Sequence, residues 1–302
     1  MSQDLIILDG GFSRELERLG APFRQPEWSA LGLMETPEIV ELAHVEFIKA
    51  GAEVITTNSY AVVPYHIGEE RFSSDGRRLI ELSGALARAA ADKHSGVRVA
   101  GCIPPLFGSY LPDDFDAERA PTLLKAFVDG LAPHADLWLI ETTSSIAEMR
   151  AAADALKAAP KPLWVSYTLR DDGDVGDDIV LRSGESVHDA VMAAMLYEAE
   201  AVLFNCSAPE VMEQAIREAK AILPETVRVG AYANAFGRTV SRAERTTPAN
   251  EGFSEMREDL DPPSYLAWAR KWHDTGATVI GGCCGIGAAH IKVLASKLQN
   301  RG

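Results

Sequence analysis

Eight short apolar segments, rich in β-branched residues, recur along the chain. They cover residues 5–10, 53–60, 97–104, 136–143, 162–169, 201–207, 227–234 and 278–284. Their apolar residues are nearly continuous and do not alternate with polar ones, which is typical of parallel strands buried on both faces. The pattern therefore predicts eight parallel strands inside one structure.

Amphipathic segments with helical spacing fill the gaps between these strands. They cover residues 37–51, 75–94, 120–134, 145–159, 186–200, 208–223, 262–276 and 287–299. Several begin with Pro or Ser near the first turn, as helices do. Eight alternating strand–helix units predict a (β/α)8 TIM barrel, in a single α/β domain over residues 1–302. An open doubly wound sheet is the main alternative, but the first strand leads into DGGFSRE and not into the glycine-rich G-x-G-x-x-G loop usual there.

Two connections are much longer than the others. Residues 11–37 contain a predicted short helix over 13–20 followed by a loop, and residues 235–260 form a polar, charged stretch that is either a lid or an insertion. Both follow a strand, so we expect both at the end of the barrel where the strands' carboxyl ends meet. In barrels of this kind that end carries the functional residues.

Composition and charge exclude several classes of function. The 302 residues are 47% hydrophobic and 24% charged, with a formal net charge of -15, which argues against binding to nucleic acid or to anionic membranes. No apolar run approaches the roughly 20 residues that span a bilayer, and no basic segment precedes the first strand, as it would in a signal peptide. We therefore expect a cytoplasmic protein, in which four cysteines do not indicate a disulfide framework.

Cysteines gather at the predicted carboxyl ends of the strands. Cys206 lies at the end of the sixth strand, and Cys283 and Cys284 end the eighth. Three thiolates can hold Zn²⁺ and leave a fourth tetrahedral position open, which is typical of a catalytic zinc site. Adjacent strand residues point to opposite faces, so the chain must turn for Cys283 and Cys284 to share an ion, and the flanking glycines permit this.

Plainer interpretations exist for the same residues. The Cys283–Cys284 pair, taken alone, also fits two buried small apolar side chains or a vicinal disulfide. Cys102 is expected to pack in the core or in a pocket wall. Asp9 and Glu141 also fit strand-end caps, and Trp28 also fits packing within its loop.

At these residues the sequence resembles the zinc-dependent homocysteine S-methyltransferase family. The matching segments run from residue 7 to residue 291 and cover nearly the whole chain. They are ILDGGFSRELERLG, WSALGLMETPEIVELAHVEFIKAGAEVITTNSY, LIETTSSIAEM, FNCSAPEVM and GATVIGGCCGIGAAHI. GGCCG together with the upstream NCS is the specific part of the resemblance.

The resemblance implies an enzyme that transfers a methyl group to the thiol of L-homocysteine and forms methionine. It implies Zn²⁺ bound by Cys206, Cys283 and Cys284, and homocysteine held near Asp9, Gly10, Gly11 and Glu141, with Glu141 facing the ammonium group. Trp28, Tyr60 and Asn234 are the candidate residues of the donor pocket.

The resemblance is less specific about the methyl donor. A sulfonium donor, S-methylmethionine or S-adenosylmethionine, is favoured, because aromatic faces attract onium methyl groups. Betaine or another quaternary ammonium compound is the close alternative. Where the family often has a proline in the segment corresponding to GAYANAFG, this chain has Ala233 before Asn234. A hypothesis from a different class is a non-catalytic zinc-binding or dithiol redox protein, and the oligomeric state is open, a homo-oligomer included.

Overall fold

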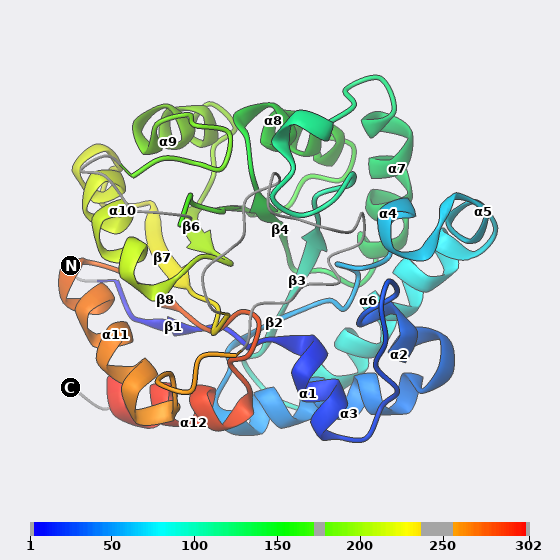
Figure 1. Ribbon diagram of the computed structural model, residues 1–302, viewed down its shortest axis with the longest axis horizontal. Coiled ribbons are helices and arrows are strands. Elements are labelled where there is room, and N and C mark those ends of the chain that lie inside the picture. Colours follow the sequence, from blue (N-terminus) through cyan, green and yellow to red (C-terminus); the bar gives the residue numbers. More distant parts are fainter. Residues whose placement is uncertain (1–2, 172–178, 237–255, 300–302) are drawn as a thin grey trace.

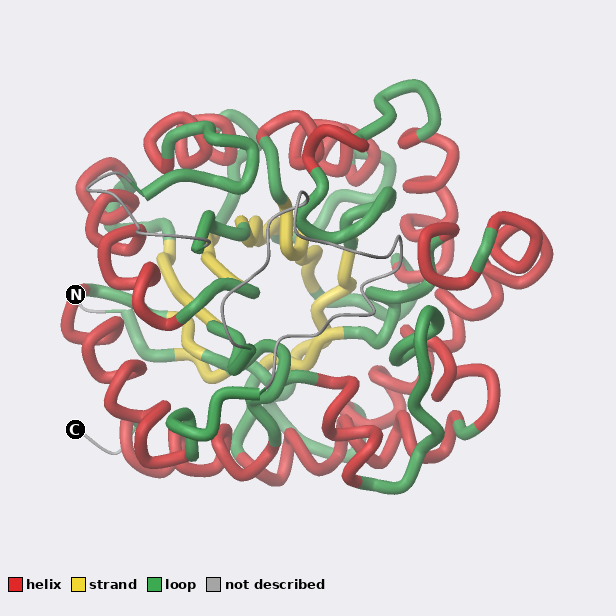
Figure 2. The backbone as a smooth tube through the Cα atoms, viewed as in Figure 1, coloured by secondary structure: helices red, strands yellow, loops and turns green. Residues whose placement is uncertain are grey.

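The eight predicted strands form one parallel sheet in the computed structural model, which describes residues 3–171, 179–236 and 256–299. The hydrogen-bonded order is β1-β8-β7-β6-β5-β4-β3-β2, and a parallel bridge between Leu8 and Val54 joins its two edges. The strands therefore surround a centre, and Figure 2 shows them as a ring inside a circle of helices. The predicted (β/α)8 barrel is confirmed. The strands are β1 (Ile6–Ile7), β2 (Val54–Thr56), β3 (Arg98–Ile103), β4 (Leu137–Thr143), β5 (Leu163–Tyr167), β6 (Ala201–Asn205), β7 (Arg228–Tyr232) and β8 (Val279–Ile280).

All nine predicted helices are present, close to their predicted bounds, and lie outside the strands (Figure 1). The helices are α1 (Phe12–Arg18), α3 (Pro37–Ala50), α6 (Arg77–Ala91), α7 (Ala120–Leu131), α8 (Ile146–Leu156), α9 (Val187–Met195), α10 (Pro209–Ile222), α11 (Pro262–Thr275) and α12 (Ala288–Leu298). Proline occupies the first turn of four of the long helices, α3, α7, α10 and α11. The side chains of Ser145, Ser186 and Asp261 cap α8, α9 and α11, each by accepting a hydrogen bond from a backbone N–H.

Several short helical turns were not predicted. The expectation of a loop after residue 20 is wrong over α2 (Ala30–Glu35), which contacts α3 and α6 and buries Leu31 and Leu33. Six residues are too few to show helical periodicity in a sequence, and packing against the neighbouring helices stabilises the turn. The others are α4 (Pro64–Ile67), α5 (Glu69–Arg71), a π-helical turn (Phe72–Gly76) and a 3-10 turn (Pro112–Asp114).

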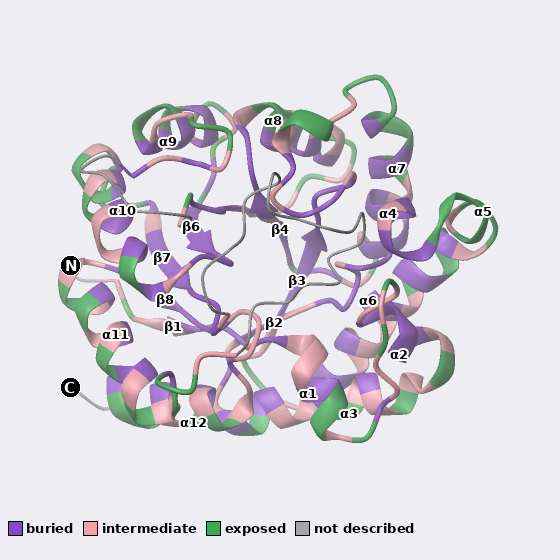
Figure 3. Ribbon diagram, in the orientation of Figure 1, coloured by how far each residue is buried: buried purple, intermediate pink, exposed green. Residues whose placement is uncertain are grey.

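Buried apolar side chains form two layers, one inside the barrel and one between the strands and the helices. Leu137 and Leu139 of β4 belong to the inner layer, whereas Trp138 and Ile140 of the same strand face the helices. This explains why the strands have continuous apolar sequences, and why Figure 3 shows most of their residues buried. In the part of the chain that is described, no helix is long and apolar enough to cross a membrane.

The 11–37 connection and the described ends of the 235–260 connection lie where the strands' carboxyl ends meet. Most of the 235–260 connection, residues 237–255, lies outside the described residues, so its prediction as a lid or an insertion stays a prediction. Its described ends are held together, because Phe236 forms a bridge with Met256 and the Ala235 N–H donates to the Cys284 carbonyl at 2.8 Å. The connection therefore begins and ends directly beside the predicted cysteine site.

Candidate active site

A cavity of about 260 Å³ opens at the carboxyl ends of the strands. A hollow of this order suits a small-molecule ligand. Nine of the ten predicted site residues line it: Asp9, Gly10, Gly11, Trp28, Tyr60, Glu141, Cys206, Cys283 and Cys284. Segments far apart in the sequence thus contribute to one site, as the barrel predicts.

Asn234 is the predicted residue that does not line this cavity. It is 2% exposed, its N–H donates to the Ser207 carbonyl, and its Oδ1 accepts from the Phe236 N–H. Its side chain stabilises the turn after β7, so the structure places it beside the site and not in the cavity wall. The neighbouring Phe236 does line the cavity.

The three predicted cysteine ligands converge. The Sγ atoms of Cys206, Cys283 and Cys284 all lie within 4.8 Å of one another. Cys206 and Cys283 are joined as a disulfide, which the sequence did not predict, whereas Cys284 is free. The vicinal Cys283–Cys284 disulfide considered above is therefore not formed. Cys102, the remaining cysteine, is not part of this cluster.

The backbone turns sharply at Cys206 and again directly after Cys284. Cys206 has a φ of 49°, in the left-handed region that costs a non-glycine residue on the order of 1–3 kcal/mol. Gly285 follows Cys284 with a φ of 85°, so the turn predicted after β8 is present. Gly11 packs on this turn, because a Cβ atom there would lie 2.4 Å from the Cys283 carbonyl oxygen. The glycines of the DGG sequence therefore pack against the cysteine loop, residues 281–286.

The cluster fits a thiophilic metal ion such as Zn²⁺. Tetrahedral Zn²⁺ with Zn–S bonds of about 2.3 Å places its sulfur ligands about 3.8 Å apart, inside the observed limit. Burial, together with the Glu141 carboxyl, raises the pKa of the Cys284 thiol to about 12, so a thiolate there needs a neighbouring cation. The disulfide must be reduced before all three sulfur atoms can act as ligands. Asn205 Nδ2 also donates to Cys283 Sγ at 4.0 Å, an orienting contact from β6.

Two carboxyl groups lie in the same cavity. Asp9 accepts two hydrogen bonds from Thr56, at 2.6 Å from its N–H and 3.1 Å from its hydroxyl. Burial nevertheless raises the pKa of Asp9 to about 8, and burial also raises the pKa of Glu141. Both groups would ionise more readily beside a bound cation, which makes the cavity a suitable environment for an ammonium group.

Sequence reasoning missed a contact behind Glu141. Cys102, on β3, is fully buried, and its thiol donates to Glu141 Oε2 at 3.2 Å. The prediction of Cys102 as a core or pocket-wall residue placed it in the right region but gave it no polar partner. The pairing of β3 with β4 sets Cys102 beside Leu139, two residues before Glu141, and that register is not readable from the sequence.

Aromatic side chains form much of the remaining wall. Trp28 lies edge-to-face on Phe23 with ring centroids 5.6 Å apart, and the Tyr60 hydroxyl hydrogen-bonds to Ser109 at 2.7 Å. Burial lowers the pKa of His66 to about 4, so this ring is neutral near pH 7. Tyr232, expected at the barrel mouth as the end of the seventh strand, also lines the cavity, and the rings here that the sequence did not indicate are Phe12, Phe23, His66, Tyr110 and Phe236. These five rings lie in loops, in the first turn of α1 or in the short helix α4, and no sequence periodicity indicated that they face the cavity.

Comparison with known proteins identifies the relatives of this fold and site. The family model for "Homocysteine S-methyltransferase" matches residues 6–298. Homocysteine S-methyltransferase 1 of Zea mays is 29% identical over 98% of this chain and 94% of its own length. The homocysteine methyltransferase MmuM from Escherichia coli is 28% identical in its metallated form, with a TM-score of 0.77 over 98% of this chain and 96% of that one. Its oxidized form has a TM-score of 0.78 at 27% identity, over the same shares of both chains.

Proposed function

The chain belongs to the homocysteine S-methyltransferase family, and from this premise we propose that it methylates homocysteine with the help of Zn²⁺ held by Cys206, Cys283 and Cys284. The convergence of these three sulfur atoms within 4.8 Å, in a cavity that also contains Glu141, is the observation that supports it most. When bound, the ion supplies Lewis-acid activation, which lowers the pKa of a thiol so that it reacts as a thiolate at neutral pH.

The residues of the chain bind and orient the amino-acid part of homocysteine. Glu141 takes the ammonium group, because it is a carboxylate open to the cavity and has the Cys102 thiol as its hydrogen-bond partner. Asp9 is tied to Thr56 through both carboxyl oxygens, so it shapes the site, and it ionises more readily once a cationic group is bound beside it. Gly10 and Gly11 complete the cavity wall beside these carboxyl groups and pack closely on the cysteine loop, because a Cβ there would lie 2.1 Å from the Ile286 carbonyl oxygen or 2.4 Å from that of Cys283.

The aromatic wall supports an onium methyl donor. Trp28 and Tyr60 line the cavity, and burial raises the pKa of Tyr60 well above its usual value, so its ring stays neutral. Neutral aromatic faces attract sulfonium and quaternary ammonium groups without a charge partner. We favour S-methylmethionine or S-adenosylmethionine as the donor, with betaine as the alternative. Holding the methyl carbon in line with the acceptor sulfur supplies much of the acceleration in such a displacement.

The metal is tested by counting zinc in the reduced protein and in single cysteine variants. The reduced wild type should hold one equivalent of zinc, and Cys206→Ala, Cys283→Ala and Cys284→Ala should each lose most of it. Cys102→Ala is the matched control, because it removes a buried thiol outside the cluster and should retain the zinc. A reduced wild type that holds no zinc, or cysteine variants that all retain it, would contradict the proposed site.

The donor is tested by mass spectrometry of methionine. Zinc-loaded protein and homocysteine are incubated separately with S-methylmethionine, S-adenosylmethionine, betaine and dimethylsulfoniopropionate. Methionine should form with one of the two favoured sulfonium donors and should be lost in Cys284→Ala. Methionine from betaine alone would select the alternative, and no methionine from any of the four would exclude the proposed donor class.

A further inference from the structure

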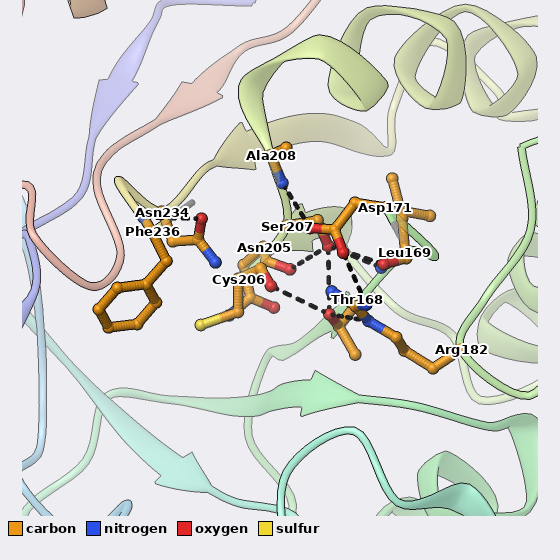
Figure 4. Close-up of polar contacts among 10 residues, drawn as sticks. All are labelled: Thr168, Leu169, Asp171, Arg182, Asn205, Cys206, Ser207, Ala208, Asn234 and Phe236. Atoms are coloured by element: carbon orange, nitrogen blue, oxygen red, sulfur yellow. Dashed lines mark hydrogen bonds and ion pairs between the residues drawn. The ribbon is translucent and has the colours of Figure 1, made fainter. Parts of the chain in front are cut away.

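An ion pair is buried next to Cys206, outside the cavity. Arg182 Nη1 lies 2.7 Å from Asp171 Oδ1, and the side chains of the two residues are 6% and 4% exposed. Burying two charges costs much of the energy that their attraction returns, so such a pair is weak evidence for a role in stability alone. Its contacts indicate a more specific role (Figure 4).

Asp171 holds the chain directly after Cys206. Its Oδ2 accepts a hydrogen bond from the Ala208 N–H at 2.9 Å, and Ala208 is the N-cap residue of α10. The carboxylate thus lies at the positive end of a 14-residue helix and satisfies a backbone donor there. This contact fixes the direction in which the chain leaves Cys206.

Arg182 reaches the same segment through side chains of the β5 end. Its Nε lies 3.5 Å from Thr168 Oγ1, and that hydroxyl donates to the Cys206 carbonyl at 3.3 Å. The Ser207 hydroxyl hydrogen-bonds to Thr168 Oγ1 at 3.1 Å and accepts from the Leu169 N–H at 2.8 Å. Figure 4 shows this network on one side of Cys206, with the cysteine sulfur pointing the other way.

Arg182 also contacts the wall of the cavity. Its guanidinium carbon lies 4.6 Å from the centre of the Tyr110 ring, and Tyr110 lines the cavity. One buried side chain therefore touches both the support of Cys206 and the wall against which substrates would pack. Both Cys206 and Tyr110 have left-handed backbones, with φ of 49° and 65°, which persist only where the surroundings hold them.

We propose that Asp171 and Arg182 are positioning residues that hold Cys206 in its left-handed conformation and so set the place of its sulfur in the metal site. The inference rests on the proposed function, because it assigns the pair a role through a metal ligand. Neither side chain lines the cavity. They act on the backbone on the carboxyl side of Cys206, while the strand pairing of β6 with β7 fixes the amino side.

The test measures zinc affinity in reduced Asp171→Asn and Arg182→Gln, by competition with a chromophoric chelator. Removal of such an indirect support should weaken binding about 10- to 100-fold while the stoichiometry stays at one. The Co²⁺-substituted variants should show altered thiolate-to-metal and d–d absorption bands, because the geometry at Cys206 changes. Arg182→Lys keeps the charge but not the planar guanidinium that spans Thr168 and Tyr110, so it should recover only part of the affinity.

Asp136→Asn is the matched control. Asp136 also pairs with an arginine, Arg88, at 3.0 Å, and also accepts from a backbone N–H, that of Val99 at 2.7 Å. It lies at the amino end of β4, opposite the site, so its variant should keep the zinc affinity and the cobalt spectrum of the wild type. Denaturant unfolding of both asparagine variants separates general destabilisation from the local effect.

A second measurement does not depend on metal. Cys206 is 4% exposed, so in reduced, metal-free wild type it should react slowly with iodoacetamide, as read by peptide mass spectrometry. Release of its backbone in Asp171→Asn or Arg182→Gln should raise that rate about fivefold or more. Zinc affinity within twofold of wild type, with an unchanged alkylation rate, overturns the inference. If the wild type itself binds no zinc, the proposed function fails and the alkylation rate alone decides the role of the pair.

Discussion

Glu141→Gln tests the part of the site that would recognise homocysteine as an amino acid. The substitution keeps the shape of the side chain and removes its charge, so the ammonium group would meet a neutral amide. A hydrogen bond to a charged group contributes about 1.5–3 kcal/mol. Since 1.4 kcal/mol is a factor of ten, the KM for homocysteine should rise about 10- to 150-fold.

The pH dependence gives the same prediction a second readout. Burial raises the pKa of Glu141, so the free protein takes up a proton there at higher pH than an exposed glutamate would. Below that raised pKa the carboxyl is neutral and attracts the ammonium group less. The affinity of the wild type for homocysteine should therefore fall as pH falls through this pKa, and the Gln variant should lack that step.

The assay is methionine formation at saturating donor, with homocysteine varied and zinc content measured in parallel. If Glu141 contributes binding that is equal in the ground state and the transition state, KM rises and kcat changes little. Glu148→Gln is the matched control, because Glu148 is also buried but accepts from the Ser144 N–H at 2.7 Å on the helix side of the barrel. A KM within twofold of wild type, with the acid step retained, would refute the assignment of Glu141.

Three further changes test other parts of the site. Burial raises the pKa of Asp9 from 3.8 to about 8, so the contribution of this group to folding stability is present below pH 4 and is lost as pH rises toward 8. In denaturant unfolding of the metal-free protein, the wild type should lose roughly a few kcal/mol between pH 5 and pH 8, and Asp9→Asn should remove this loss. The Tyr265 hydroxyl accepts a hydrogen bond from the Ala233 N–H at 3.1 Å and donates one to the Gly281 carbonyl at 2.8 Å. Tyr265→Phe should therefore lower the free energy of unfolding in urea by about 1–3 kcal/mol, and an unchanged urea midpoint would contradict this. Trp28→Leu should raise the KM of an onium donor about 2- to 30-fold, and an equal rise for homocysteine would argue against a donor-specific role.

The barrel could be predicted because its strands are buried on both faces. A buried parallel strand needs apolar residues at nearly every position, and eight such runs separated by helices leave few other folds. The strand ends were less predictable. β1 and β8 are only two residues long, although longer runs were expected from their apolar sequences.

The site was predictable where the barrel alone determines the place of a residue. The carboxyl ends of all strands meet at one mouth, so Cys206 and Cys283 could be expected there although 77 residues separate them. Contacts that depend on register or on loop conformation were not predictable. The pairing of Cys102 with Glu141 needs the register of β3 on β4, and Asn234 lies beside the cavity because its side chain accepts a hydrogen bond within its own loop.

Asn205 links the two halves of the proposed substrate site. Its side chain lies between β4, where it donates to Thr142 Oγ1 at 2.8 Å, and the cysteine loop, where it donates to Cys283 Sγ at 4.0 Å. Thr142 directly follows Glu141, so one buried amide connects the residue proposed for the ammonium group to a ligand proposed for the metal. In the proposed function homocysteine reaches both points at once, so the spacing of the two strand ends that Asn205 connects sets the distance that its carbon chain has to span. Selectivity for the chain length of the acceptor would then follow from this spacing.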